Sequence, residues 1–230
     1  MRPLLSERGV LQRADGSAKW AQEGSAVLAA VHGPHAAGQR KEDAERGVVE
    51  VLFKPRHGLP GPAECEYEEV LRQLVEQVVL LAHHPRTLVL VVVQVLQADG
   101  ALLAVAANAV CAALVDAGLP LCCMTAAVSC AFGADGTLVL DPDAAEEQAA
   151  CAVVCAAFPC SHTLDASGSR QLSVPEQSLL VHSRGRLSVA QLAQALEVCR
   201  RGCEGVAKFV GLGLVTTFKD AMVKSTDPAA

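Results

Sequence analysis

The segment from residue 87 to 118 constrains the fold of this chain more than any other. It begins with a run of β-branched and apolar residues, TLVLVVVQVL, reaches Asp99-Gly100, and continues as an alanine-rich stretch. The first part predicts a strand over 87–98, and its continuous apolar character is typical of a strand that is buried on both faces. The second part predicts a buried helix over 100–117. In many proteins a strand, a tight turn and a helix in this order bind a phosphate at the helix N-terminus.

The turn itself lacks the side chains that would hold a phosphate. Ala101, Leu102 and Leu103 follow Gly100, and none of them is a Ser, Thr, Lys or Arg. A phosphate bound here would have no cationic or hydroxyl partner from the turn, and such partners supply the strong, charge-assisted hydrogen bonds. We therefore expect Gly100, Ala101 and Leu102 to form at most a degenerate phosphate site.

The remaining segments predict one mixed domain. Strands are predicted as a meander over 9–33, at 47–56, at 149–158 and at 178–182, with a hairpin through Asp135-Gly136. Helices are predicted between the Gly/Pro turn at 58–62 and Pro85, and from Leu187 to about Lys219. Strands and helices do not alternate strictly, and no long linker divides them. We expect a single α+β domain over 1–220, followed by a disordered tail over 221–230.

Composition excludes several classes of protein. With 51% hydrophobic residues, the 230-residue chain can bury a substantial core. A net charge of −6 argues against a generally basic protein that coats nucleic acid. No run reaches the length of a membrane span, and the first residues lack the apolar core of a signal peptide, so we expect a cytosolic or nuclear protein without a membrane partner. The ten cysteines include no CxxC pair and are expected to be free thiols.

Several short motifs in order resemble the RNase PH family, and within it the ring subunits of the RNA exosome. The matching stretches are ADGSAKWAQEGSAVLAAVHGP at 14–34, KPRHGLPG at 54–61, HPRT at 84–87, VQVLQADG at 93–100, NAVCAALVDAGLP at 108–120 and DGTLVLDP at 135–142. Together they cover residues 9 to about 147, whereas the C-terminal third resembles the family only in pattern. The resemblance implies the mixed-sheet RNase PH-like fold.

The resemblance also implies a reaction, the 3′ to 5′ phosphorolysis of RNA with inorganic phosphate as co-substrate. This chemistry needs a held phosphate, cations that grip the RNA backbone, and an acid for the leaving oxygen. Active members carry Gly, a hydroxyl residue and Arg after the Asp-Gly turn, where this chain has Ala101, Leu102 and Leu103. The loss of the Arg predicts weak or absent phosphate binding and phosphorolysis.

Acidic residues of the family's catalytic site are partly retained. Asp141 matches one Asp of the active members, and Glu147 stands at the position of the second, so both are catalytic candidates. Asp143 and Glu146 lie in the same loop, and a divalent metal such as Mg²⁺, held by Asp141, Asp143 and Glu147, is a further possibility. The alternative is a solvated acidic loop that caps a helix.

Cations of the RNA path are the best retained feature. Arg86 matches an arginine of the family that contacts the RNA backbone, and Lys54 and Arg56 lie on a segment that borders the RNA path. Such phosphate contacts give affinity without sequence preference. The alternatives are that Arg86 pairs with a surface carboxylate and that Lys54 and Arg56 protect an edge strand from aggregation.

Three functions are therefore open. The leading hypothesis is an RNA-binding ring subunit of the exosome, in a complex that processes and degrades RNA 3′ to 5′, with other RNase PH-like subunits and single-stranded RNA as partners. The resemblance places such a subunit in the nucleus, the nucleolus and the cytoplasm, and in isolation the chain is expected to form a homodimer. The second is a self-sufficient homodimeric nuclease, either phosphorolytic on RNA or metal-dependent and hydrolytic on RNA or DNA. The third is a non-catalytic α+β interaction scaffold.

Overall fold

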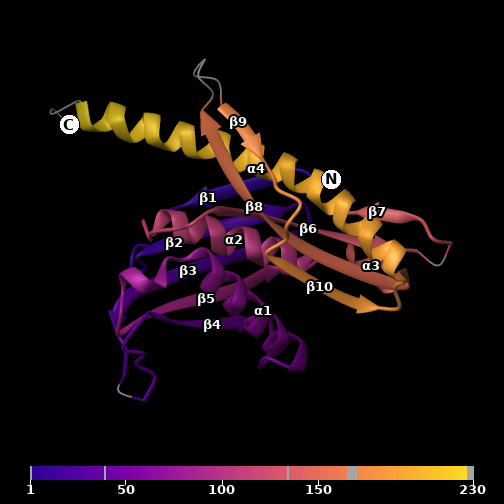
Figure 1. The fold of residues 1–230 in the computed structure, drawn as a ribbon, viewed down its shortest axis with the longest axis horizontal. Helices are drawn as coiled ribbons and strands as arrows, with labels where there is room; N and C mark the ends of the chain where they lie inside the picture. The colour runs from indigo at the N-terminus through magenta and orange to yellow at the C-terminus, as the bar shows by residue number, and fades with distance from the viewer. Residues whose placement is uncertain (1, 39, 134, 165–169, 227–230) are drawn as a thin grey trace.

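Two five-stranded sheets share one hydrophobic core in the computed structural model of this chain (Figure 1). The structure describes residues 2–38, 40–133, 135–164 and 170–226. The first sheet has the order β1-β2-β3-β5-β4. Its strands are β1 (Leu4–Arg8), β2 (Gly16–Gln22), β3 (Ser25–Ala36), β4 (Val48–Lys54) and β5 (Thr87–Gln97). Its strands pair antiparallel except β4 and β5, which are parallel.

The second sheet is built from the C-terminal half of the chain. Its main order is β10-β8-β6-β7, and β9 pairs with β8; the strands are Met124–Phe132 (β6), Leu138–Leu140 (β7), Ala152–Leu164 (β8), Arg170–Ser173 (β9) and Leu180–Gly185 (β10). The predicted hairpin through Asp135-Gly136 is confirmed, because β6 and β7 pair antiparallel on either side of it. With this second sheet, the chain has the mixed α+β architecture that the sequence predicts.

The described residues also form four α-helices, three of which pack on these sheets. They are α1 (Pro62–Val78), α2 (Leu102–Asp116), α3 (Ala144–Ala149) and α4 (Val189–Thr226), and a short 3₁₀ turn spans Leu81–His83. Helix α2 contacts β2 and β3 of one sheet and β6 of the other, so it lies between the sheets, as its small and almost entirely buried residues require. Helix α1 packs on β4, and α4 packs on β6 and β8 and reaches β1.

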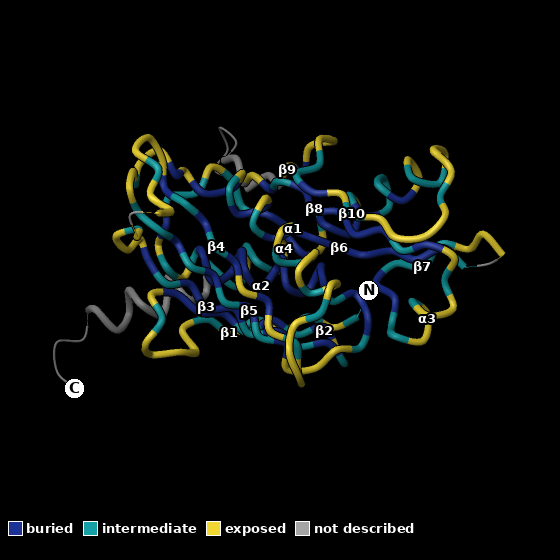
Figure 2. The backbone as a smooth tube through the Cα atoms, turned by 90° about the horizontal axis from the view of Figure 1, so that it is seen from below, coloured by how far each residue is buried: buried dark blue, intermediate teal, exposed yellow. Residues whose placement is uncertain are grey.

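The buried residues lie mainly on the strands and between the two sheets. Figure 2 shows buried residues concentrated along the strands in the middle of the molecule and exposed residues in the loops at its ends. Trp20, the only tryptophan of the chain, is fully buried and packs edge to face against Phe209 of α4, with ring centroids 5.7 Å apart. This contact joins the final helix to the first sheet.

Two expectations need correction. Strand β5 is not buried on both faces, because Val89, Val91, Val93 and Val95 face the core whereas the alternate residues are only partly buried or exposed. The expected tail over 221–230 is helical as far as Thr226, and residues 227–230 lie outside the described part of the chain. None of the described helices is long and apolar enough to cross a membrane.

Candidate active site

The turn between β5 and α2 is the centre of the candidate site. Gly100 and Ala101 both have left-handed backbones, with φ of +77° and +49°. A Cβ on Gly100 would lie 2.4 Å from the carbonyl oxygen of Pro142, because the segment between β7 and α3 crosses directly over the turn. Ser25 holds the turn through two hydrogen bonds: its hydroxyl donates to the Gly100 carbonyl at 2.7 Å and accepts from the Asp99 N–H at 2.9 Å. The predicted strand, turn and helix are confirmed, and the turn requires glycine.

Asp141 is buried beside this turn and is held by Arg2. Its side chain is 2% exposed. The Arg2 backbone N–H donates to Oδ2 at 2.9 Å, and the Arg2 guanidinium donates to Oδ1 at 2.8 Å and to the Asp99 carbonyl at 2.7 Å. Burial by itself would lower the pKa of Arg2, but the hydrogen bond and negative charge of Asp141 outweigh it and raise that pKa above its ordinary value. Asp141 therefore fastens the N-terminal segment to the turn.

Glu147 lies on the other side of the same turn. It belongs to α3, and its Oε1 accepts a hydrogen bond from the backbone N–H of Ala101 at 2.7 Å. Ala101 is the N-cap of α2, and the free N–H groups at a helix N-terminus are the groups that attract an anion. The Glu147 carboxylate therefore already accepts the hydrogen bond of a backbone N–H that a bound phosphate would need.

Asp143 serves a local purpose. Its side chain accepts from the Glu146 N–H at 2.7 Å, and the Glu146 side chain accepts from the Asp143 N–H at 3.0 Å, which is a capping box at the start of α3. The expected metal site at Asp141, Asp143 and Glu147 is not formed: no group of three or more His, Cys, Asp or Glu side chains that could hold a metal gathers within the described residues. Each of these carboxylates has a separate hydrogen-bond partner, which explains why they do not converge.

A small cavity adjoins Glu147 where α2 begins. Its volume is about 40 Å³, room for a few water molecules, and its lining includes Tyr67, Glu147, His182 and Arg184. Burial, and next the charge of Glu147, raise the pKa of Tyr67 above its ordinary value. Sequence reasoning missed His182 and Arg184, although their spacing of two along β10 places both on one face of the strand.

The three predicted RNA contacts lie at two different places. Lys54 ends β4 and Arg56 follows it, so both lie at the end of the parallel β4–β5 pair from which the chain enters the turn. Arg86 precedes β5 at the opposite end of the pair. At about 3.3 Å per residue, the 11 residues of β5 separate Arg86 from the turn by about 36 Å.

Arg86 is already paired within the chain. Its guanidinium Nε lies 3.3 Å from Glu42 Oε1, and 69% of its side chain is exposed. The ion pair is compatible with either interpretation of Arg86, because an exposed ion pair of this kind contributes little and leaves the guanidinium accessible.

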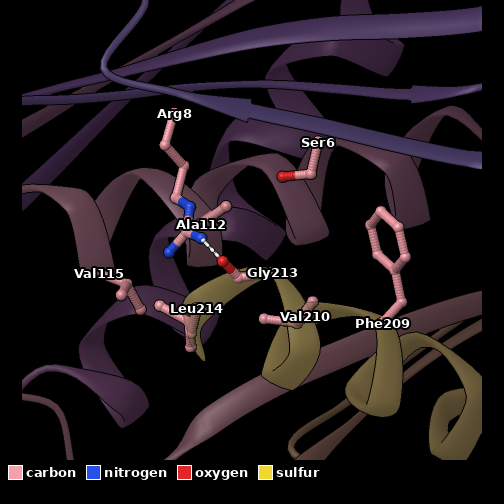
Figure 3. Close-up of a pocket in the computed structure, with 8 residues that line it drawn as sticks. All are labelled: Ser6, Arg8, Ala112, Val115, Phe209, Val210, Gly213 and Leu214. Carbon is pink, nitrogen blue, oxygen red and sulfur yellow. Dashed lines mark hydrogen bonds between the residues drawn. The ribbon is translucent and has the colours of Figure 1, made fainter. Parts of the chain in front are cut away.

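A larger cavity lies elsewhere, between β1, α2 and α4 (Figure 3). Its volume is about 200 Å³, and Ala112, Val115, Val210 and Leu214 supply much of its apolar lining. Arg8 crosses it and donates a hydrogen bond to the Gly213 carbonyl at 2.7 Å, which fastens α4 to β1. This cavity is lined mainly by apolar and small side chains and is separate from the turn.

Comparison with known proteins assigns the family. The 3′ exoribonuclease family, domain 1 (RNase PH), matches residues 1–120. The chain belongs to the RNase PH family. The exosome complex exonuclease RRP46 homolog of Arabidopsis thaliana is 43% identical over 159 residues, which cover 69% of this chain and 66% of that protein. The homolog of Oryza sativa subsp. japonica is 45% identical over 64% of this chain and 62% of that protein. This RNase PH chain thus spans slightly less than two thirds of these curated relatives.

Other similarities extend over more of the chain. The exosome complex component RRP41 of Mus musculus is 31% identical over 99% of this chain and 91% of that protein. The crystal structure of rice Rrp46 superposes with a TM-score of 0.79 at 34% identity, covering 91% of this chain and 93% of that one. An Archaeoglobus fulgidus exosome with RNA bound to the active site shares the fold, with a TM-score of 0.71 at 18% identity over 91% of this chain and 88% of that chain. The RNase PH-like fold predicted from the motifs is confirmed.

Proposed function

We propose that this RNase PH chain is an RNA-binding ring subunit of an exosome that processes and degrades RNA 3′ to 5′, and that its phosphate turn is structural. The observation that carries the proposal is the hydrogen bond from the Ala101 N–H to Glu147. The relatives named above support the assembly, since they are exosome subunits by name.

Phosphorolysis needs inorganic phosphate held beside the RNA backbone by fixed donors. In this chain Glu147 takes the Ala101 amide, and Leu102 and Leu103 offer no replacement donor from their side chains. A phosphate at the turn would also meet the negative charge of Glu147 at short range, and like charges at such distances repel. Weak or absent phosphate binding follows, and with it weak or absent phosphorolysis.

RNA binding is supported by cations that remain accessible. Lys54 and Arg56 are exposed near the turn, and Arg86 is exposed at the far end of β5. We assign to them nonspecific contacts with the phosphates of single-stranded RNA, which weaken as the salt concentration rises. Because Arg86 lies about 36 Å from the turn, its contact belongs to a longer RNA path than one pocket provides.

Assembly is supported by the outer face of the first sheet, the face turned away from α2. Alternate residues of its strands place apolar side chains on that face, and Leu5, Leu52 and Leu96 are 50%, 42% and 40% exposed. Neighbouring rows add partly buried apolar residues such as Leu28 and Val92. Exposed apolar side chains on one face of a sheet favour a protein interface there. We assign it to related ring subunits, or to a second copy when the chain is alone, and place the complex in the nucleus, nucleolus and cytoplasm.

The test uses a 5′-labelled single-stranded RNA with the purified chain, with and without inorganic phosphate. We expect salt-sensitive binding, no shortening and no release of nucleoside diphosphates. Arg86→Glu should weaken binding at least several-fold. Arg201→Glu is the matched control, because Arg201 is an equally exposed arginine paired with a glutamate on α4, and it should leave binding unchanged.

Other outcomes would point to the alternatives. Shortening that requires phosphate would refute the structural role of the turn and support a phosphorolytic homodimer. Shortening of RNA or DNA that a chelator abolishes would support metal-dependent hydrolysis with Mg²⁺. No binding at physiological salt would support the interaction scaffold.

A further inference from the structure

Two adjacent cysteines between α2 and β6 hold their thiols side by side near the surface. The Sγ atoms of Cys122 and Cys123 are 3.7 Å apart. Cys122 is exposed and Cys123 is partly buried. A second close pair, Cys130 and Cys199, has Sγ atoms 3.5 Å apart, but both of these residues are buried in the core. Solvent ions can therefore reach the first pair far more readily than the second.

Hydrogen bonds hold the first pair against the end of α1. The Leu80 N–H donates to the Pro120 carbonyl at 2.9 Å, and the Cys122 N–H donates to the Val78 carbonyl at 2.9 Å. The Cys122 thiol itself donates to the Gln77 carbonyl at 3.1 Å. The backbone of the pair is thus ordered before any ligand arrives, which lowers the entropic cost of binding.

The separation of the two sulfur atoms suits a shared cation. Zinc-type cations bind thiolates at about 2.3 Å in tetrahedral geometry, which places two ligand sulfurs about 3.8 Å apart. The observed 3.7 Å needs almost no adjustment to reach this value. Two thiols supply half of a tetrahedral set, and since no larger group of metal-binding side chains gathers in the described parts of the chain, water would complete the coordination.

We propose that Cys122 and Cys123 form a two-thiol binding site for a thiophilic divalent cation of the zinc and cadmium type. Burial, and next the neighbouring Cys122 thiol, raise the pKa of Cys123 to about 12, so without metal this residue is a thiol. Binding forms two metal–sulfur bonds, breaks two S–H bonds and releases two protons, with no change of oxidation state. The site lies at the opposite end of α2 from the Asp99-Gly100 turn and goes beyond the proposed function.

The experiment titrates Cd²⁺ alone into the reduced, metal-free full chain and follows the ultraviolet charge-transfer band of cadmium–thiolate bonds. We expect the band to saturate at one Cd²⁺ per chain. Cys122→Ser and Cys123→Ser should each weaken binding at least tenfold. Cys65→Ser and Cys151→Ser, which change exposed cysteines elsewhere, are the matched controls and should bind like the unaltered chain.

Two results would overturn the proposal. One is an unchanged titration when Cys122 and Cys123 are both replaced by Ser. The other is loss of the band in Cys199→Ser, which would place the cation at the buried pair. Trp20 fluorescence during urea unfolding identifies any variant whose fold has changed, because this single tryptophan is fully buried.

Discussion

Replacing Asp141 by Asn should destabilise the protein by about 3 kcal/mol. The side chains of Arg2 and Asp141 are 12% and 2% exposed, and two hydrogen bonds join the residues. Removing one partner of a buried ion pair costs about 3–5 kcal/mol because the other charge is left uncompensated. We expect the lower end, since Asn keeps one oxygen acceptor and Arg2 keeps its bond to the Asp99 carbonyl.

Urea unfolding followed by Trp20 fluorescence measures this loss. With a urea m-value of about 3 kcal/mol/M, the midpoint should fall by about 1 M. Asp143→Asn is the matched control: it makes the same change two residues away, and because Asn caps helices as well as Asp does, stability should change by less than about 0.5 kcal/mol. If Asp141→Asn cost no more than this control, the Arg2–Asp141 pair would not be an anchor of the turn.

Three further predictions test other parts of the structure. Tyr67 is the only tyrosine, so ultraviolet absorbance reports its ionisation alone; its midpoint should lie above 10, and Glu147→Gln should lower it, whereas no change would contradict the placement of Glu147. Hydrogen bonds from Arg200 and Arg201 lower the pKa of Glu197 to about 2, so these contacts should stabilise the fold above the unfolded pKa of about 4.3 and be lost as the pH falls through 2; an NMR carboxyl titration with a midpoint near 4.3 would refute this. In urea unfolding, Gly100→Ala should lower the free energy of unfolding by at least about 2 kcal/mol more than Gly136→Ala does. Both positions have φ near +80°, but only at Gly100 would the added Cβ meet a backbone atom. Equal losses of stability would contradict the close approach of Pro142.

The parts of the fold that the sequence predicts are those with strong local patterns. The strand at 87–97 is a run of β-branched residues, and the helix after Gly100 and the long final helix are rich in Ala and Leu, so each has a strong local preference for its element type. Strand β1, Leu4–Arg8, was not predicted, because its five residues become a strand only by pairing with β2. The exposure of the outer face of β5 could not be predicted either, because a continuous apolar run does not show which of its two faces is covered by another layer of the fold.

The candidate site could be located from the sequence but its contacts could not. Asp141 and Glu147 do flank the predicted turn. Their partners, Arg2 and the Ala101 N–H, are 139 and 46 residues away along the chain, and no local pattern connects them. Whether a carboxylate is a free acid or a structural anchor depends on such distant contacts.

Under the proposed function, the parallel pairing of β4 with β5 sets the spacing between two groups of cations that contact RNA. Lys54 pairs with Gln94, which lies eight residues along the chain from Arg86, so the two groups of cations are about 26 Å apart. A single strand stacked as in a duplex advances about 3.4 Å per nucleotide, so it must contain about nine nucleotides to touch both groups at once. On this proposal, the length of a strand in the first sheet sets the footprint of one subunit on RNA.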